Sequence, residues 1–165
     1  MLVGKHIFLR KLQPTDIDVL LKWENDTENW KVSGTKKPFT HSEIESFVNG
    51  KHDLYLNEQI RYVICLNDSE MQIGTIDLFE FDEHGKTVGI GVLIAERARR
   101  NYGYASEALS LVVDYCRNEL SLVNLFCNIQ KDNVTSIRLF EKNGFQFIEE
   151  KELFGKPVNY YELKL

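Results

Sequence analysis

Short stretches in which apolar and polar residues alternate, or in which apolar residues follow one another, predict the strands of this chain. The seven predicted strands lie at 6–12, 60–66, 72–81, 87–95, 122–130, 145–153 and 158–165. Turn-forming residues occupy 67–70 and 82–86. They indicate that the second, third and fourth strands form an antiparallel meander.

Four other segments carry apolar residues at the three- and four-residue spacing of an amphipathic helix. They lie at 15–24, 41–50, 105–120 and 133–142. We expect capping boxes at the first two helix starts, formed by Thr15 with Asp18 and by Thr40 with Glu43. Gly50 is expected to end the second helix in a left-handed turn.

Helices interleave with hairpin-connected strands over all 165 residues, and no linker, repeat or low-complexity run divides them. This order is typical of an α+β domain, a mixed α/β sandwich with one mixed sheet. We therefore predict a single domain spanning residues 1–165. Its seven-stranded sheet is expected to be mostly antiparallel and flanked by about four helices.

Charge and composition exclude several partners. The formal net charge of −5 leaves no basic surface for nucleic acid. Three widely spaced cysteines within apolar patterns predict reduced core thiols, and scattered histidines predict no metal site. With no run of about 18 apolar residues and no signal-peptide pattern, no membrane association is expected and the cytoplasm is the predicted location.

The loop "RRNYGYASEAL" at 99–109 opens the third predicted helix. The N–H groups of 101–106 lack partners at a helix start, and the helix dipole attracts an anion there. Gly103 allows close approach, Asn101 tolerates a left-handed conformation, and Arg99 and Arg100 add permanent charge. A plain strand-to-helix loop with solvated arginines is an equally weighted alternative.

Nucleotide-binding alternatives fail on spacing. Ile94 stands where a dinucleotide fingerprint needs its third glycine, and no phosphate loop or nucleophile elbow is present. Arg100-x-x-Gly103-x-Ala105, however, resembles the acetyl-CoA signature of the GNAT N-acetyltransferases. Downstream, "NVTSIRLFEKNGF" at 133–145 resembles the family's second conserved block. The two blocks and the element order extend this resemblance over essentially the whole chain.

The resemblance implies the GNAT fold and acetyl-CoA as cofactor. It implies that the N–H groups of 101–106 bind pyrophosphate, that Leu93 and Ile94 bind the pantetheine arm, and that Leu93 N–H donates to the developing oxyanion. Asn133, also a candidate helix N-cap, would line the sulfur end with Ser136. The implied cofactor-binding residues are Leu93, Ile94, Arg99, Arg100, Asn101, Tyr102, Gly103, Tyr104, Ala105, Ser106, Asn133 and Ser136.

Two departures from the family affect proton transfer. Phe140 replaces a tyrosine that many relatives use as general acid, and Gly89 replaces a glutamate that relays a proton through water. Asp77 and Glu80 are the candidate bases, expected on opposite faces of a regular strand, so that at most one faces the site. Glu80 is preferred, with an exposed strand-end carboxylate as the alternative. Asn128 is a polar candidate beside the acyl group.

The segment "KWENDTENWKVSG" at 22–34 places Glu24, Asp26 and Glu28 between Trp23 and Trp30. Carboxylates and indoles together can bind an aliphatic cation. The alternative is a helix end with solvated acids and tryptophans packed in the core. "WEND" and "IDLFEF" resemble the spermidine/diamine branch and the ribosomal-protein N-terminal acetyltransferase-like group.

These features together predict acetyl transfer from acetyl-CoA to a primary amine by direct attack. A small polyamine or diamine is the first expectation for the acceptor. N-terminal acetylation of a protein and a non-catalytic acetyl-CoA-binding module are the alternatives. Tyr160 and Tyr161 on the last strand leave a homo-oligomer open.

Overall fold

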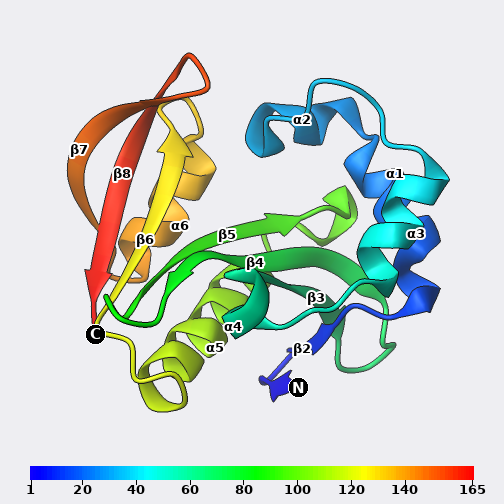
Figure 1. Cartoon of the computed structure of the whole chain (residues 1–165), viewed down its shortest axis with the longest axis horizontal. Coiled ribbons are helices and arrows are strands. Elements are labelled where there is room, and N and C mark those ends of the chain that lie inside the picture. The colour runs from blue at the N-terminus through cyan, green and yellow to red at the C-terminus, as the bar shows by residue number, and fades with distance from the viewer.

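The computed structural model describes the backbone of residues 1–165 and the side chains of 1–30 and 34–165. Eight strands form a single sheet in the order β1-β2-β3-β4-β5-β6-β8-β7. Figure 1 labels strands β2 to β8 of this sheet. The strands are β1 Leu2–Val3, β2 Ile7–Lys11, β3 Ile60–Leu66, β4 Gln72–Asp82, β5 Thr87–Ile94, β6 Asn124–Gln130, β7 Gln146–Leu153 and β8 Lys156–Lys164. Only β5 and β6 run parallel among these pairs.

Six α-helices and two short 3-10 helices accompany the sheet over the described backbone. The α-helices are α1 Ile17–Glu24, α2 Thr27–Ser33, α3 His41–Asn49, α4 Leu54–Asn57, α5 Tyr104–Asn118 and α6 Val134–Lys142. The 3-10 helices are η1 Pro14–Asp16 and η2 Arg97–Arg99. Each predicted helix is present, with no bound shifted by more than two residues.

The predicted fold class is confirmed, but the counts of strands and helices are not. The sheet has eight strands rather than seven, because β1 adds a two-residue edge strand opposite Phe8 and Leu9. Two residues are too few to show a periodicity. The extra helices α2 and α4 are likewise short, and each begins at an aspartate N-cap, Asp26 and Asp53.

The local signals for helix ends succeed in part. Thr40 and Glu43 form the predicted capping box at α3. The predicted box at Thr15 is wrong, because the chain enters α1 through η1 and the Asp16 carboxylate accepts the Gln13 N–H instead. The left-handed turn at Gly50 is also wrong. Gly50 has φ −69° and ψ 174°, an extended conformation.

Two apolar clusters lie on opposite faces of the sheet. Val112 and Leu109 of α5 pack with inward residues of β4 and β5 such as Ile76 and Ile90. On the other face, α1 and α3 cover β3 through Leu20, Trp23, Ile44, Val48 and Val63. Cys65, Cys116 and Cys127 are free and buried, which confirms the prediction of core thiols. Burial raises the pKa of Cys116 to about 12.

The parallel strands β5 and β6 pair over three positions, from Thr87 with Asn124 to Gly89 with Phe126. Beyond these pairs the strands part, and in Figure 1 the sheet divides into a β1–β5 portion and a β6–β8–β7 portion. The separation leaves the facing backbone edges of two strands available within one sheet. The candidate site lies at this separation between β5 and β6.

Candidate active site

The loop before α5 forms a sharply turned helix start. Asn101 has φ 67° and Gly103, the N-cap residue, has φ 82°, so the predicted left-handed tolerance of Asn101 is used. The first helical hydrogen bond runs from Glu107 N–H to the Gly103 carbonyl at 3.0 Å. The N–H groups of Tyr104, Ala105 and Ser106 therefore have no partner within the helix.

The two predicted arginines differ in their contacts. Arg100 Nε donates to the carbonyl oxygen of Ile94 at 2.8 Å and so ties the loop to the end of β5. Arg99 Nη2 lies 3.9 Å from the sulfur of Met71. Both guanidinium groups are partly exposed beside the helix start. They add positive charge to an end of α5 that the helix dipole already makes positive.

The opening between β5 and β6 forms a cavity of about 820 Å³, which we call the cofactor groove. Its walls come from β5 at Ile90 to Val92, from β6 at Phe126 to Gln130, and from Asn133, Ser136 and Phe140. Asn133 Oδ1 accepts the Ser136 N–H at 3.2 Å, so the predicted N-cap is confirmed.

Asn128 contributes an unusual polar atom to this groove. Its Oδ1 is buried and has no hydrogen-bond partner. A buried acceptor without a partner is costly, and such an atom is often satisfied by a bound ligand. At the loop, a Cβ on Gly103 would have no neighbour within 4 Å. The groove and the helix start thus fit an elongated ligand that carries hydrogen-bond donors and an anionic group.

The strand register bears on the predicted donor, Leu93 N–H. Ala95 N–H donates to the Ile73 carbonyl at 2.9 Å, and Leu93 lies opposite Thr75 two positions along. Hydrogen-bonded pairs alternate in an antiparallel ladder, so Leu93 N–H points toward β4. Val92 N–H points to the opposite edge, and Val92 lines the cofactor groove. The register therefore favours Val92 over Leu93 as the donor into the groove.

Gly89 and Phe140, the two positions linked to proton transfer by the family resemblance, both lie among aromatic rings. A Cβ on Gly89 would collide with the ring of Phe79 and lie 2.8 Å from Phe126, so a glutamate has no room there. Phe140 is 2% exposed and packs edge-on against Phe145. Neither position can supply an acid or a base.

A tyrosine that the sequence reasoning did not single out for this site lines the same groove. Tyr160 of β8 lies opposite Asn128, and its hydroxyl donates to Glu162 Oε1 at 2.8 Å. Burial, together with Glu162, raises the pKa of Tyr160 to about 12. Its hydroxyl therefore stays protonated near neutral pH. Residues 128 and 160 are far apart in sequence, and the register of β6 and β8 brings Tyr160 to the cofactor groove.

The expected separation of Asp77 and Glu80 onto opposite faces is wrong. The pairing of β4 with β5 shifts between Phe79 and Asp82, and Glu80 takes φ 50°. This irregularity turns Glu80 to the side of the sheet where Asp77 lies, and both residues line the cofactor groove.

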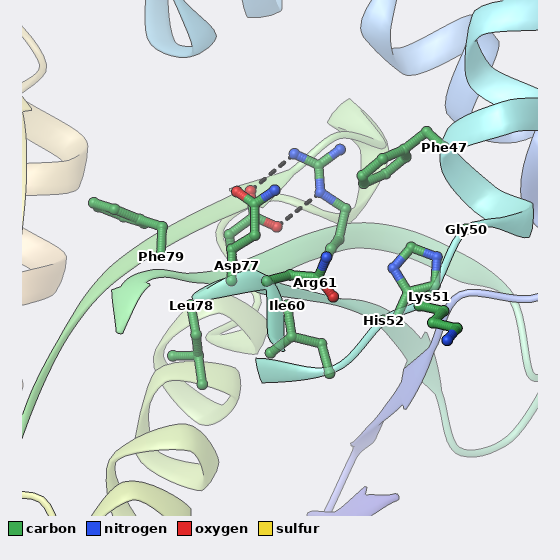
Figure 2. A pocket seen from close by; sticks show the side chains of 11 residues that line it. Phe47, Gly50, Lys51, His52, Ile60, Arg61, Asp77, Leu78 and Phe79 are labelled. Atoms are coloured by element: carbon green, nitrogen blue, oxygen red, sulfur yellow. Dashed lines mark hydrogen bonds and ion pairs between the residues drawn. The ribbon is translucent and has the colours of Figure 1, made fainter. Parts of the chain in front are cut away.

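Asp77 also forms part of an ion-pair cluster with Arg61 and Glu24, which we call the Arg61 cluster. Arg61 donates from Nε and Nη2 to the two oxygens of Asp77 at 2.7 and 2.8 Å, and from Nη1 to Glu24 Oε1 at 2.6 Å. Figure 2 shows the paired Arg61 and Asp77, with Phe47 beside the guanidinium. Sequence reasoning missed Arg61, although an arginine within the apolar strand "IRYVICL" was the available signal.

The electrostatics of the Arg61 cluster follow from its burial. Desolvation alone would lower the pKa of Arg61. The attraction to Asp77 and Glu24 has the larger effect and raises the pKa of Arg61 above its ordinary value. The arginine therefore remains charged. It balances one of the two carboxylates.

The other predicted acidic residues form a separate ion-pair group, the Arg97 cluster. Arg97 Nη2 lies 2.8 Å from an oxygen of Asp26 and 2.8 Å from one of Glu28. Asp26 also caps α2 by accepting the Glu28 N–H. Neither Asp26 nor Glu28 lines the cofactor groove or the two cavities next to it. The acidic side chains of the predicted substrate segment therefore do not meet at one site.

The two tryptophans of that segment are anchored by their indole N–H groups. Trp23 is 5% exposed and donates to Glu96 Oε1 at 2.8 Å. Trp30 is half-buried and donates to the Glu24 carbonyl at 2.7 Å. Trp23 belongs to the core cluster under α1, whereas Trp30 lines the cofactor groove.

Two further cavities adjoin the Arg61 cluster. One cavity, of about 470 Å³, extends past Phe47 and His52, and Figure 2 shows the side chains that line it. The connecting cavity, of about 140 Å³, lies between Trp23 and Val92. Asp77 lines both of these and the cofactor groove as well. It is therefore the common wall of all three spaces.

Among the side chains that the structure describes, no group of three or more histidine, cysteine, aspartate or glutamate residues could hold a metal ion. Within the same part of the chain, no helix has the length and apolar character needed to cross a membrane.

Comparisons with known proteins agree with this geometry. Residues 6–146 match the family model described as an acetyltransferase (GNAT) domain. The chain is 29% identical over 147 residues to an uncharacterized N-acetyltransferase, p20, of Bacillus licheniformis, covering 88% of this chain and 82% of p20. It is 24% identical to an N-acetyltransferase 9-like protein of Caenorhabditis briggsae, covering 93% and 81%. A solved spermidine N-acetyltransferase of Vibrio cholerae, in complex with CoA and spermine, superposes with a TM-score of 0.85 at 20% identity over 96% of this chain and 95% of that one.

Proposed function

Because this chain belongs to the GNAT acetyltransferase family and is an acetyl-CoA-dependent N-acetyltransferase, we propose that it acetylates the primary amine of a small cationic molecule. A diamine or polyamine is the expected acceptor. The spermidine acetyltransferase among the structural neighbours is consistent with this choice. The reduced cysteines are consistent with a cytoplasmic location.

One observation supports a cationic amine as the acceptor. The Arg61 cluster holds two carboxylates for one guanidinium, which leaves a net negative charge where the three cavities meet. A protonated amine is attracted to such a charge, and a neutral or anionic acceptor gains nothing from it. Gly91, opposite Asp77 on β5, has no side chain to cover that wall.

The cofactor-binding residues fit acetyl-CoA, which supplies an acyl thioester when bound. We assign the pyrophosphate to the N–H groups of 101–106, with Arg99 and Arg100 adding charge. We assign the donor to the reacting carbonyl oxygen to Val92 N–H rather than Leu93 N–H, because the register of β4 and β5 turns Val92 N–H away from β4. We assign the pantetheine arm to Asn133 and Ser136, which line the cofactor groove, together with Ile94 at the end of β5.

The acceptor arrives as an ammonium ion and must lose a proton before it can attack. Glu80 is our choice for the proton acceptor, because it lines the cofactor groove and stands outside the Arg61 cluster. Both oxygens of Asp77 are already bonded to Arg61. Asn128 Oδ1, buried and without a partner, can accept an N–H of the amine.

A protein N-terminus is the second candidate acceptor, and one observation favours it. Lys36, Lys151 and Lys156 also line the cofactor groove. Their positive charge suits an acceptor that combines an amine with acidic groups farther along, as an acidic peptide does. The distal ammonium of a polyamine would be repelled there.

The test is release of free CoA from acetyl-CoA with a panel of acceptors. The panel holds spermidine, spermine, putrescine, single amino acids, and neutral and acidic peptides with free N-termini. Turnover with polyamines and not peptides supports the proposal, and turnover with acidic peptides alone replaces it by the second candidate. CoA binding without turnover of any amine would mean a binding module and would contradict catalysis.

A further inference from the structure

Arg61 is the centre of the Arg61 cluster. Among the described side chains, this is the only ion-pair cluster that touches all three cavities. The partners of Arg61 come from distant parts of the chain, since Glu24 ends α1 and Asp77 lies on β4. Arg61 itself lies on β3, directly opposite Asp77 in the sheet. One side chain thus links the covering helix to the strand that walls the cofactor groove.

The geometry fixes both carboxylates. Arg61 grips Asp77 through two parallel hydrogen bonds, which set the plane of that carboxylate as well as its distance. The third bond, from Nη1, sets the position of Glu24. The side chains of Arg61, Glu24 and Asp77 are 23%, 21% and 31% exposed, so the cluster is shielded yet open to a ligand.

Phe47 of α3 further restricts the guanidinium, whose central carbon lies 5.6 Å from the centre of its ring. A lysine at this position would keep the charge but could not make the two-pronged contact with Asp77 together with the bond to Glu24. The arrangement therefore depends on an arginine and not only on a positive charge.

We propose that Arg61 is a positioning residue for the acceptor, holding Glu24 and Asp77 in the arrangement that receives the ammonium group. This inference rests on the proposed function. In this proposal, the backbone of α1 or β4 alone does not hold either carboxylate in place. Their joint placement beside Gly91 and Val92 depends on one guanidinium group. Arg61 does not itself touch the reacting atoms.

The test compares Arg61→Met and Arg61→Lys with Arg97→Met. The last variant removes an arginine that also bridges two carboxylates, those of Asp26 and Glu28, and lies away from the cavities. For each variant we measure amine KM and kcat, the Kd of CoA by calorimetry, and the thermal midpoint. These separate a loss of acceptor placement from a general loss of structure.

For R61M we expect kcat/KM for the amine to fall about 100-fold, mostly through KM, with the Kd of CoA unchanged within about twofold. R61K is expected to recover part of that loss, and R97M to remain within about twofold of the wild-type protein. A purely structural role would instead lower the thermal midpoint of R61M and R61K while leaving the amine KM of the folded fraction unchanged.

Should R61M not fold, R61K alone decides, because a folded R61K with wild-type amine KM overturns the inference. The failure of the proposed function looks different. If the wild-type protein turns over no amine of the panel, the function and the inference both fall. If the wild-type protein turns over an amine and folded R61M matches its kcat/KM within about threefold, only the inference falls.

Discussion

The Arg61 and Arg97 clusters are built from the same residue types, one arginine and two carboxylates, yet they occupy different environments. The Arg61 side chain is 23% exposed and its partners lie on the walls of three cavities. The Arg97 side chain is 53% exposed, and its partners lie at the start of α2, Asp26 as the N-cap and Glu28 in the first turn. Solvent therefore screens the charges of the Arg61 cluster less than those of the Arg97 cluster.

A third pair, Arg10 with Asp16, provides a structural reference. The Asp16 carboxylate is 0% exposed and receives two hydrogen bonds from Arg10, at 2.7 and 2.8 Å. It also accepts the Gln13 N–H and lines none of the three cavities. We expect this pair to affect stability alone, which distinguishes it from the role we propose for Arg61.

The largest effect is expected at this reference pair. Asp16→Asn should lower the free energy of unfolding by about 3 kcal/mol at neutral pH, because it leaves a half-buried guanidinium without its counter-charge. Urea unfolding measures the loss. The Kd of CoA and the amine KM of the folded variant should not change, and a rise in either would remove Asp16 from the structural role.

The loss of unfolding free energy in D16N depends on pH. Burial by itself would raise the pKa of Asp16, but the bonds from Arg10, Gln13 and Gln72 hold it below its ordinary value of 3.8. A lowered pKa stabilises the fold above the unfolded value, and that stabilisation is lost as the pH falls through the folded value. The difference between wild-type protein and D16N should therefore narrow below about pH 4. A constant difference down to pH 3 would contradict the assignment.

The cofactor side offers the next largest effect, independent of both clusters. Gly103→Val should raise the Kd of CoA by about 10- to 100-fold, because a β-branched residue resists φ 82° and disturbs the N–H groups of the helix start. Calorimetry gives the Kd, and circular dichroism checks the fold. Gly103→Asn, which tolerates this conformation better, is the control and should bind CoA more tightly than G103V. Equal, unchanged affinity in both variants would exclude the loop.

A smaller effect separates the two clusters directly. Glu24→Gln preserves shape but removes the excess negative charge of the Arg61 cluster, so amine kcat/KM should fall about tenfold. Glu28→Gln removes the same charge from the Arg97 cluster, and kcat/KM should stay within about twofold. Steady-state kinetics at one ionic strength compare them. Equal losses in the two variants would mean that the acidic segment acts as one site.

The smallest effect concerns the stability of the exposed cluster. Arg97→Met should change the free energy of unfolding by less than about 0.5 kcal/mol, because exposed ion pairs are screened and weak. Urea unfolding at low and high salt measures it, and the difference should shrink further at 1 M salt. A loss of 2 kcal/mol or more would show that the Arg97 cluster anchors α2.

Several features of the site could be predicted from local sequence. The helix start at Gly103 and the N-cap at Asn133 follow from backbone preferences over a few residues, and both are present. Residue type and position identify Asp77 and Glu80 as candidates, but they do not predict the relative orientation of the two side chains, because the shift in pairing after Phe79 depends on β5. Arg61 and Tyr160 were missed because their partners are far away in sequence.

The sequence by itself determined the order of the longer elements, the mixed α+β sheet, the turned helix start at Gly103 and the membership of a family. Each depends on periodicity, caps or a short motif. Only the tertiary structure decided which arginine meets which carboxylate, that Glu24 separates from Asp26 and Glu28, and that Val92 rather than Leu93 faces the cofactor groove. These outcomes depend on strand register and on contacts between distant segments, which no local pattern of residues encodes.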